Sequence, residues 1–311
     1  MSVRVGTCSW ADDSLSKLWY PAGVSSAEAR LRFYADHFDT VEVNSSYYAL
    51  PTEAMATAWA ERTPPGFVFH VKAFGMMTRH PVRVEQLPPD LRSQAEFDHR
   101  GRVQHPSHEL REEVFRRFRR AIEPLRQAGK LGGVLMQLPP YVVYKPESLA
   151  YLEWARGQLE GLHMLVEFRH RSWLADDAVQ PVLAFLEQLP ATYVMVDAPR
   201  LAASNVAPTV VATTSAAAYL RLHGRNKATW NVRGGSASDR FDYLYGRDEL
   251  AEWVGPLREL AARTDDVWVM FNNNGHSTDV ASGREIAQAP TNATELLELL
   301  RDAGVPVAAA R

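Results

Sequence analysis

The stretch LVEFRHRSW, residues 165–173, begins as a buried strand and ends in charge. Leu165 and Val166 are typical of a strand that is covered on both faces. Glu167 and Arg169 follow at the end of the same run. A buried ionised side chain costs several kcal/mol unless it is paired or hydrogen-bonded. The charged end of this strand therefore indicates either a structural ion pair or a cleft that admits a ligand.

Similar apolar runs recur along the chain, with helical patterns between them. The runs occupy residues 3–7, 40–44, 67–72, 132–138, 164–168, 192–196, 218–223 and 267–272. Helices are predicted at 25–38, 52–63, 109–129, 146–159, 176–189, 247–263 and 291–304, but no clear helix is indicated within 198–217. About eight alternations over 311 residues predict one domain, an α/β fold of the (β/α)₈ or TIM-barrel type with a degraded sixth helix. A doubly wound sheet is the alternative, but no Gly-rich turn follows the first strand.

The connection after the third predicted strand, residues 75–108, is unusually long. Connections of this length are commonly functional or disordered. In a barrel this connection would leave the carboxyl end of a strand, where active sites lie. We therefore expect an insertion over the barrel mouth, acting as a mobile lid or as a wall.

Composition excludes several classes of protein. The net charge is -3 and the charged fraction is 23%, so no overall field favours nucleic acid or an anionic membrane. The single cysteine, Cys8, rules out an internal disulfide and suits a reducing compartment. The start, MSVRVGTCSW, lacks a signal-peptide pattern, and no apolar run approaches the ~20 residues of a membrane span. We expect a cytoplasmic protein without a membrane partner; the sequence does not indicate an oligomeric state.

Polar side chains gather at the carboxyl ends of the predicted strands, whereas the opposite ends are almost wholly apolar. In a barrel these ends converge on one mouth. The predicted cleft residues are Glu42, Asn44, Lys72, Gln137, Glu167, Arg169, Asp197, Arg221, His223 and Asn272. Any one of them could be structural, and a Glu167–Arg169 pair is the simplest example. Burial of so many polar groups at one end nevertheless indicates a function.

Several segments together resemble the YecE-like family. They include GTCSW (6–10), FDTVEVNSSYYALP (38–51), LGGVLMQLPP (131–140), VEFRHRSW (166–173) and FNNNG (271–275), in this order. The resemblance implies a TIM barrel and no established activity. That fold is similar to the endonuclease-IV-like barrels, which suggests nucleic acid or phosphoesters as ligands by analogy. The chain departs from the family pattern at Thr78-Arg79-His80, within the long connection.

Phosphate is the ligand group that the predicted cleft favours. Lys72, Arg169, Arg221 and His223 would supply positive charge, and Arg can hold two oxygens at once. The predicted catalytic side chains are Glu42, Glu167, Asp197 and His223, and the predicted ligand contacts are Asn44, Lys72, Gln137, Arg169, Arg221, Asn272, Trp10 and Tyr48. The aromatic rings could stack on a base or a sugar. The ligand would be a small phosphorylated molecule or a single-stranded nucleic acid, with hydrolysis of a phosphoester as the candidate reaction.

Other functions remain open at this point. Glu42 and Glu167 could serve as the carboxylate pair of a glycoside hydrolase. The cleft could also bind nucleic acid without turning it over. A single divalent ion could be held by the side chains of Glu42, Glu167, Asp197 and His223. We do not expect a metal, because the chain has no H-x-x-E-H motif or His-x-His pair, and no other cofactor is indicated.

Overall fold

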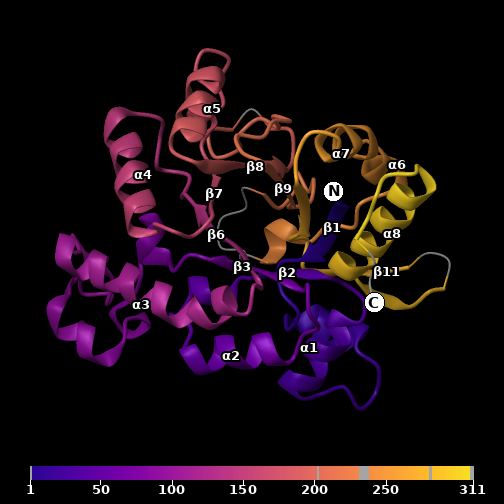
Figure 1. The fold of residues 1–311 in the computed structure, drawn as a ribbon, viewed down its shortest axis with the longest axis horizontal. Coiled ribbons are helices and arrows are strands. Elements are labelled where there is room, and N and C mark those ends of the chain that lie inside the picture. Colours follow the sequence, from indigo (N-terminus) through magenta and orange to yellow (C-terminus); the bar gives the residue numbers. More distant parts are fainter. Residues whose placement is uncertain (1, 202, 231–237, 280–281, 309–311) are drawn as a thin grey trace.

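The computed structural model describes residues 2–201, 203–230, 238–279 and 282–308. Its centre is a closed barrel of eight parallel strands (Figure 1). The strands are β1 (Ser2–Thr7), β2 (Thr40–Val43), β3 (Val68–Lys72), β6 (Leu131–Gln137), β7 (Met164–Glu167), β8 (Ala191–Asp197), β9 (Ala217–Leu222) and β10 (Asp266–Phe271). They follow one another around the barrel in chain order, and β10 pairs with β1 to close it. The predicted (β/α)₈ barrel is confirmed.

Helices surround the strands (Figure 1). They are α1 (Ala27–Ala35), α2 (Glu53–Glu61), α3 (His108–Gln127), α4 (Pro146–Gln158), α5 (Val179–Gln188), α6 (Arg247–Ala251), α7 (Val254–Ala261) and α8 (Gln288–Asp302). The helix predicted at 247–263 is divided into α6 and α7. Between β8 and β9, residues 198–201 and 203–216 contain no helix. This agrees with the prediction that the sixth helix of the barrel is degraded.

Side chains alternate between the inside and the outside of each strand, as the two-residue period of a strand requires. In the lower part of the interior, His70 lies against the rings of Tyr219 and Trp268, with centroids 4.8 and 4.7 Å apart. Outside, Phe168 stacks on Trp173, with centroids 4.2 Å apart, and both are buried. The interior therefore has an apolar and aromatic floor, and the polar side chains lie above it toward the carboxyl ends.

The insertion 75–108 consists of short 3₁₀ turns and a two-stranded hairpin, β4 (Glu96–Phe97) with β5 (Val103–Gln104). Its apolar side chains Met76, Met77, Val82, Leu87, Leu91 and Val103 belong to the hydrophobic core of the protein. Asp90 is bound by Arg117 of α3 at 2.5 Å. The insertion is thus packed beside α3. The structure favours a fixed wall over a mobile lid. That the insertion lies over the barrel mouth and acts there stays a prediction.

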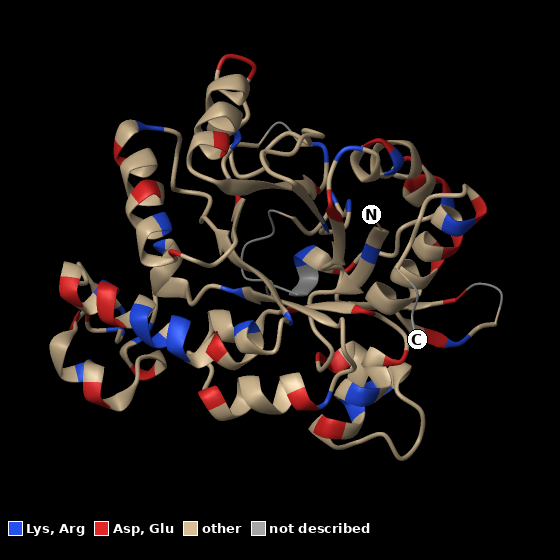
Figure 2. Ribbon diagram, viewed as in Figure 1, with Lys and Arg blue, Asp and Glu red and all other residues tan. Residues whose placement is uncertain are grey.

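Charged residues are concentrated on the helices around the barrel, whereas the strands are mostly free of them (Figure 2). Within the described ranges, no helix combines the length and the apolar character that crossing a membrane requires.

Candidate functional site

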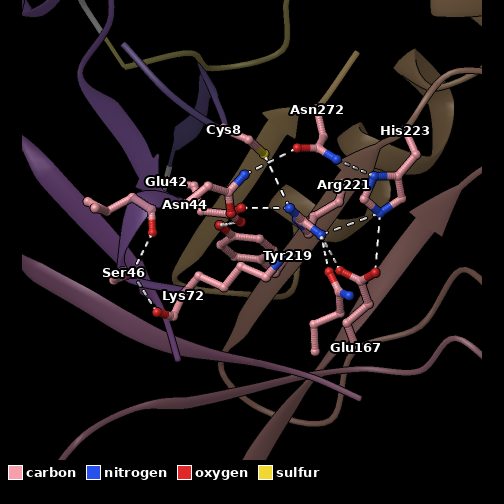
Figure 3. Close-up of polar contacts among 12 residues, drawn as sticks. Cys8, Glu42, Asn44, Ser46, Lys72, Glu167, Tyr219, Arg221, His223 and Asn272 are labelled. Carbon is pink, nitrogen blue, oxygen red and sulfur yellow. Dashed lines mark hydrogen bonds and ion pairs between the residues drawn. The ribbon is translucent and has the colours of Figure 1, made fainter. Parts of the chain in front are cut away.

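Arg221 occupies the centre of a buried polar cluster at the mouth of the barrel (Figure 3). Its Nη2 donates to Oε1 of Glu42 at 2.6 Å, and its Nη1 donates to Oε2 of Glu167 at 2.5 Å. All three side chains are 0% exposed. The hydroxyl of Tyr219 donates to the second oxygen of Glu42 at 2.9 Å. One guanidinium therefore links two carboxylates from strands on different sides of the barrel.

The second oxygen of Glu167 is also engaged. It pairs with Nε of Arg169 and lies 3.2 Å from Nε2 of His223. Burial raises the pKa of this carboxyl, but Arg169 and Arg221 outweigh that effect and hold the pKa of Glu167 well below its usual range. Glu167 is therefore an ionised structural and electrostatic anchor, and it is poorly suited to act as a general acid.

His223 connects this carboxylate to two amide side chains. Nδ2 of Asn272 donates to Nδ1 of His223 at 2.9 Å, and Nδ2 of Asn44 donates to Oδ1 of Asn272 at 3.2 Å (Figure 3). Nε2 of His223 lies 2.9 Å from Nη2 of Arg169, which can only donate, and 3.2 Å from Oε1 of the Glu167 carboxylate, which can only accept. Burial, followed by the charge of Arg169, holds the pKa of His223 well below its usual range. The ring is thus neutral, and both of its nitrogens are held by polar neighbours.

Lys72 differs from the other cations of the cluster. Its ammonium lies over the ring of Tyr47, 4.7 Å from the centroid, and forms no ion pair with the described part of the chain. Burial, followed by the charge of Arg221, lowers the pKa of Lys72 to about 8. This is a positive group at the edge of the cluster that lacks a carboxylate partner.

Residues from the connecting loops border the cluster. His80 stands beside Tyr47 with ring centroids 5.1 Å apart, and burial, followed by Lys72, lowers the pKa of His80 to about 3. Phe241 faces His223 at 5.4 Å and the Arg169 guanidinium at 6.0 Å. Tyr47, His80, Tyr219 and Phe241 were not among the predicted site residues, since each resembles an ordinary packing residue in the sequence.

Most of the predicted residues do come together at this mouth. Glu42, Asn44, Lys72, Glu167, Arg169, Arg221, His223 and Asn272 share the contacts described above, and Gln137 joins them by long contacts of 3.4 Å to Arg169 and Arg221. Arg221 was predicted as a principal ligand contact. Both of its terminal nitrogens are instead occupied by carboxylates inside the protein.

Asp197 does not belong to this cluster, contrary to its predicted catalytic role. It accepts hydrogen bonds from Arg225 at 2.7 Å, Tyr245 at 3.1 Å and Trp253 at 2.8 Å. Tyr245 precedes α6 and Trp253 lies between α6 and α7, so the carboxylate points out of the barrel toward these helices. Its role in this structure is to hold that layer of the protein to β8.

Of the two aromatic residues that we predicted as ligand contacts, Trp10 lies away from the cluster. Trp10 packs edge-on against Trp59 of α2 and Phe69, at 5.7 and 6.2 Å, between the barrel and that helix. Tyr48 is 59% exposed and meets the ring of Tyr47 edge-on, with centroids 5.0 Å apart, so its role as a ligand contact stays a prediction. Its neighbour Tyr47 carries the ring that faces the cluster, because the 3₁₀ turn Ser45–Tyr47 places adjacent side chains on different sides.

The four residues considered for a divalent ion do not converge. Asp197 faces the helices, and the Arg221 guanidinium lies between Glu42 and Glu167. Across the described ranges, no group of three or more His, Cys, Asp and Glu side chains is arranged to hold a metal. A metal site at the mouth would need carboxylate oxygens that are free to bind the ion. Here Arg221 pairs with oxygens of both Glu42 and Glu167.

Comparisons with known proteins agree with the barrel. Residues 4–309 match the family model described as "Protein of unknown function DUF72". The UPF0759 protein YunF of Bacillus subtilis (strain 168) is 32% identical over 290 residues, which cover 92% of this chain and 94% of that protein.

Two solved structures are similar over almost the whole chain. A DUF72 family protein from Thermotoga maritima MSB8 is 28% identical with a TM-score of 0.74, covering 97% of this chain and 100% of that one. A DUF72 family protein from Enterococcus faecalis V583 has a TM-score of 0.75 at 24% identity, covering 96% of this chain and 95% of that one. The expectation that the chain belongs to a barrel family without an assigned reaction is confirmed. This chain belongs to the DUF72 family.

Proposed function

We propose that the barrel mouth binds a phosphate-containing ligand through Lys72 and Arg169. The observation that carries the proposal is the charge balance of the buried cluster. Three cationic side chains, Lys72, Arg169 and Arg221, face two carboxylates, Glu42 and Glu167, and the neutral His223 adds no charge. One positive charge therefore remains, and it lies on the side of Lys72.

The same two cations are the ones a ligand can reach. Arg221 has no exposed surface, whereas the Arg169 side chain is 13% exposed and Lys72 is half-buried. An oxyanion between Lys72 and Arg169 would gain charge-assisted hydrogen bonds in a region of reduced dielectric. The fixed amides of Asn44 and Gln137 would be close enough to orient the rest of the ligand.

The glycoside-hydrolase alternative is less well supported by this arrangement. Such enzymes place the sugar between two free carboxyl groups, one of which has a raised pKa. Here the Arg221 guanidinium fills the space between Glu42 and Glu167, and the pKa of Glu167 is lowered. The alternative of a module that binds nucleic acid without turning it over is also less well supported, because Trp10 packs against α2 and is not free to stack on a base.

Hydrolysis of a bound phosphoester is the finer form of the proposal, and the two cations favour it. The ammonium of Lys72 and the guanidinium of Arg169 would stabilise the negative charge that develops on the phosphoryl oxygens as a water attacks and releases its proton to solvent. The water oxygen would bond to phosphorus as the ester oxygen leaves with the electron pair of the broken P–O bond. The test is release of p-nitrophenol from p-nitrophenyl phosphate by the wild type and by Lys72→Gln. Equal rates would remove the catalytic claim and leave binding alone.

Binding itself is tested by calorimetry with phenyl phosphate. We expect Lys72→Gln and Arg169→Gln to weaken the affinity by about tenfold or more, the value of one charge-assisted hydrogen bond. Lys17→Gln is the matched control, because Lys17 is an exposed lysine (71% of its side chain) paired with Asp13. Short single-stranded DNA and a neutral oligosaccharide complete the series. Unchanged affinity in folded Lys72→Gln, or binding of the oligosaccharide alone, would overturn the proposal.

A further inference from the structure

A cavity of about 580 Å³ opens between the insertion, the start of α3 and the connection from β6 to α4. Ligand pockets in proteins commonly have volumes of this order. His80 lines the cavity, and its ring lies 5.1 Å from that of Tyr47, which carries the Lys72 ammonium over its face, so the cavity adjoins the barrel mouth. None of the residues used in the proposed function lines it.

The wall of this cavity is basic. Arg79, Arg111 and Lys145 line it, and no described Asp or Glu does. Arg79 and Arg111 form no ion pair with the described residues, and Lys145 has only a loose pair with the exposed Glu147, at 3.9 Å. Elsewhere on α3 four arginines pair with carboxylates, as in the contact of Arg126 with Glu123 at 2.6 Å. The cavity thus concentrates positive charge that the chain itself does not balance.

Two buried polar groups at the cavity lack hydrogen-bond partners. Ser148 is 1% exposed and lines the cavity, and its hydroxyl contacts no donor or acceptor of the described chain. Nε of Arg111 is likewise buried without a partner. The great majority of buried polar side-chain atoms in native proteins are hydrogen-bonded. An unpaired donor on each of two neighbouring walls points to a ligand that accepts hydrogen bonds.

Local structure adds to the attraction for an anion. Helix α4 begins at Pro146, after Lys145, and Ser148 lies in its first turn. A helix of 13 residues presents partial positive charge at this end. Across the cavity, Arg79 lies over the ring of Tyr151, with its guanidinium carbon 5.1 Å from the centroid, which holds the side chain in place. The exposed ring of Tyr141 also lines the cavity and offers an apolar face.

We infer that this cavity is a second oxyanion site, suited to the dianionic phosphate of a small phosphomonoester. The phosphate oxygens accept from Arg111, Lys145 and the hydroxyl of Ser148. The organic part of the ligand lies against Tyr141. The site is separate from the contacts of Lys72 and Arg169.

The experiment is calorimetric titration with phenyl phosphate, followed by phenol and benzoate as neutral and carboxylate probes. We expect two equivalents of phenyl phosphate for the wild type. Arg111→Gln and Lys145→Gln should weaken one of them about tenfold, since each removes a charge-assisted contact. Ser148→Ala should weaken the same equivalent several-fold without a change in charge. This third variant separates direct contact from a general effect of the field.

Arg126→Gln is the matched control, because it removes the same charge from the same helix at a paired, exposed position. Lys72→Gln should weaken chiefly the other equivalent. Two equivalents that persist unchanged in the folded Lys145→Gln and Ser148→Ala variants would overturn the inference. So would a single equivalent that Lys72→Gln removes. A single equivalent that only the cavity variants remove would support this site and refute the one at the mouth.

Discussion

Arg221 and Glu42 meet inside the barrel at 2.6 Å, and neither side chain has any surface exposed to solvent. The pair joins β9 to β2 across the interior, on strands that do not neighbour each other in the sheet. Burial of two charges costs several kcal/mol per ion, and their attraction offsets this only with good geometry and further hydrogen bonds. Tyr219 and Glu167 provide those additional contacts.

Removal of Arg221 should therefore be strongly destabilising. We expect Arg221→Met to lower the free energy of unfolding by roughly 3–5 kcal/mol at pH 7, because it leaves two carboxylates buried without their shared partner. Urea denaturation measures the effect, with Arg126→Gln as the surface control. A loss below about 1 kcal/mol would show that Glu42 and Glu167 do not depend on this guanidinium.

Binding of a phosphate-containing ligand at the mouth should weaken in alkali. The pKa of Lys72 is lowered to about 8, so the ammonium is present below that pH and is lost as the pH rises through it. Phenyl phosphate stays dianionic over this range. Affinity at the mouth should fall between pH 8 and 10 in the wild type and stay nearly level in Lys72→Arg. Parallel curves for the two proteins would show that Lys72 is not the titrating contact.

The histidines should make the protein less stable in weak acid. Burial lowers the pKa of His70, His80, His163, His170 and His223. The unfolded chain therefore takes up protons below about pH 6.5 that the folded chain does not, and stability falls as the pH drops from about 7 to 5. Burial also raises the pKa of Asp12, and that of Asp39 to about 6, and these two groups act in the opposite direction.

His70 offers a test of this pH dependence. It has no exposed surface, and neither ring nitrogen has a hydrogen-bond partner in the described chain. His70→Leu should make the decline between pH 7 and 5 shallower by up to about 1.4 kcal/mol per pH unit. The free energy of unfolding is measured by urea denaturation at each pH. An unchanged slope would mean that His70 already takes up a proton in the folded protein.

The corrected place of Asp197 can be separated from the mouth experimentally. Asp197→Asn should lower the free energy of unfolding by about 2 kcal/mol, because Arg225 and the indole of Trp253 lose a charged acceptor. Its affinity for phenyl phosphate should equal that of the wild type. A loss of affinity without a loss of stability would return Asp197 to the functional site.

The strands and most of the cluster could be predicted because strand period and burial act together. Tyr219 and Arg221 of β9, and His223 directly after it, are two residues apart, so they share the interior face. The same reasoning fails for β8, ATYVMVD, because all seven of its residues are buried. An apolar strand covered on both faces does not reveal which face is the interior, and Asp197 was consequently assigned to the wrong one.

Other features depend on contacts between distant segments. Tyr47 and Tyr48 are adjacent and chemically identical, and only a 3₁₀ turn decides which ring meets Lys72. The basic cavity draws residues from the insertion, α3 and α4. Ser148 resembles an ordinary first-turn residue of a helix, so its lack of a partner is visible only once the fold is known.

The packing of the insertion gives a final prediction. Leu91 is 2% exposed within the core, whereas Phe97 in the hairpin is 56% exposed. Leu91→Ala should lower the free energy of unfolding by about 2–4 kcal/mol, since it leaves a cavity. Phe97→Ala, the control from the same insertion, should change it by less than about 0.5 kcal/mol. Urea denaturation distinguishes the two outcomes. Equal, small effects of both substitutions would show that the insertion is not held by the core, and would restore the mobile lid that the length of the connection first suggested.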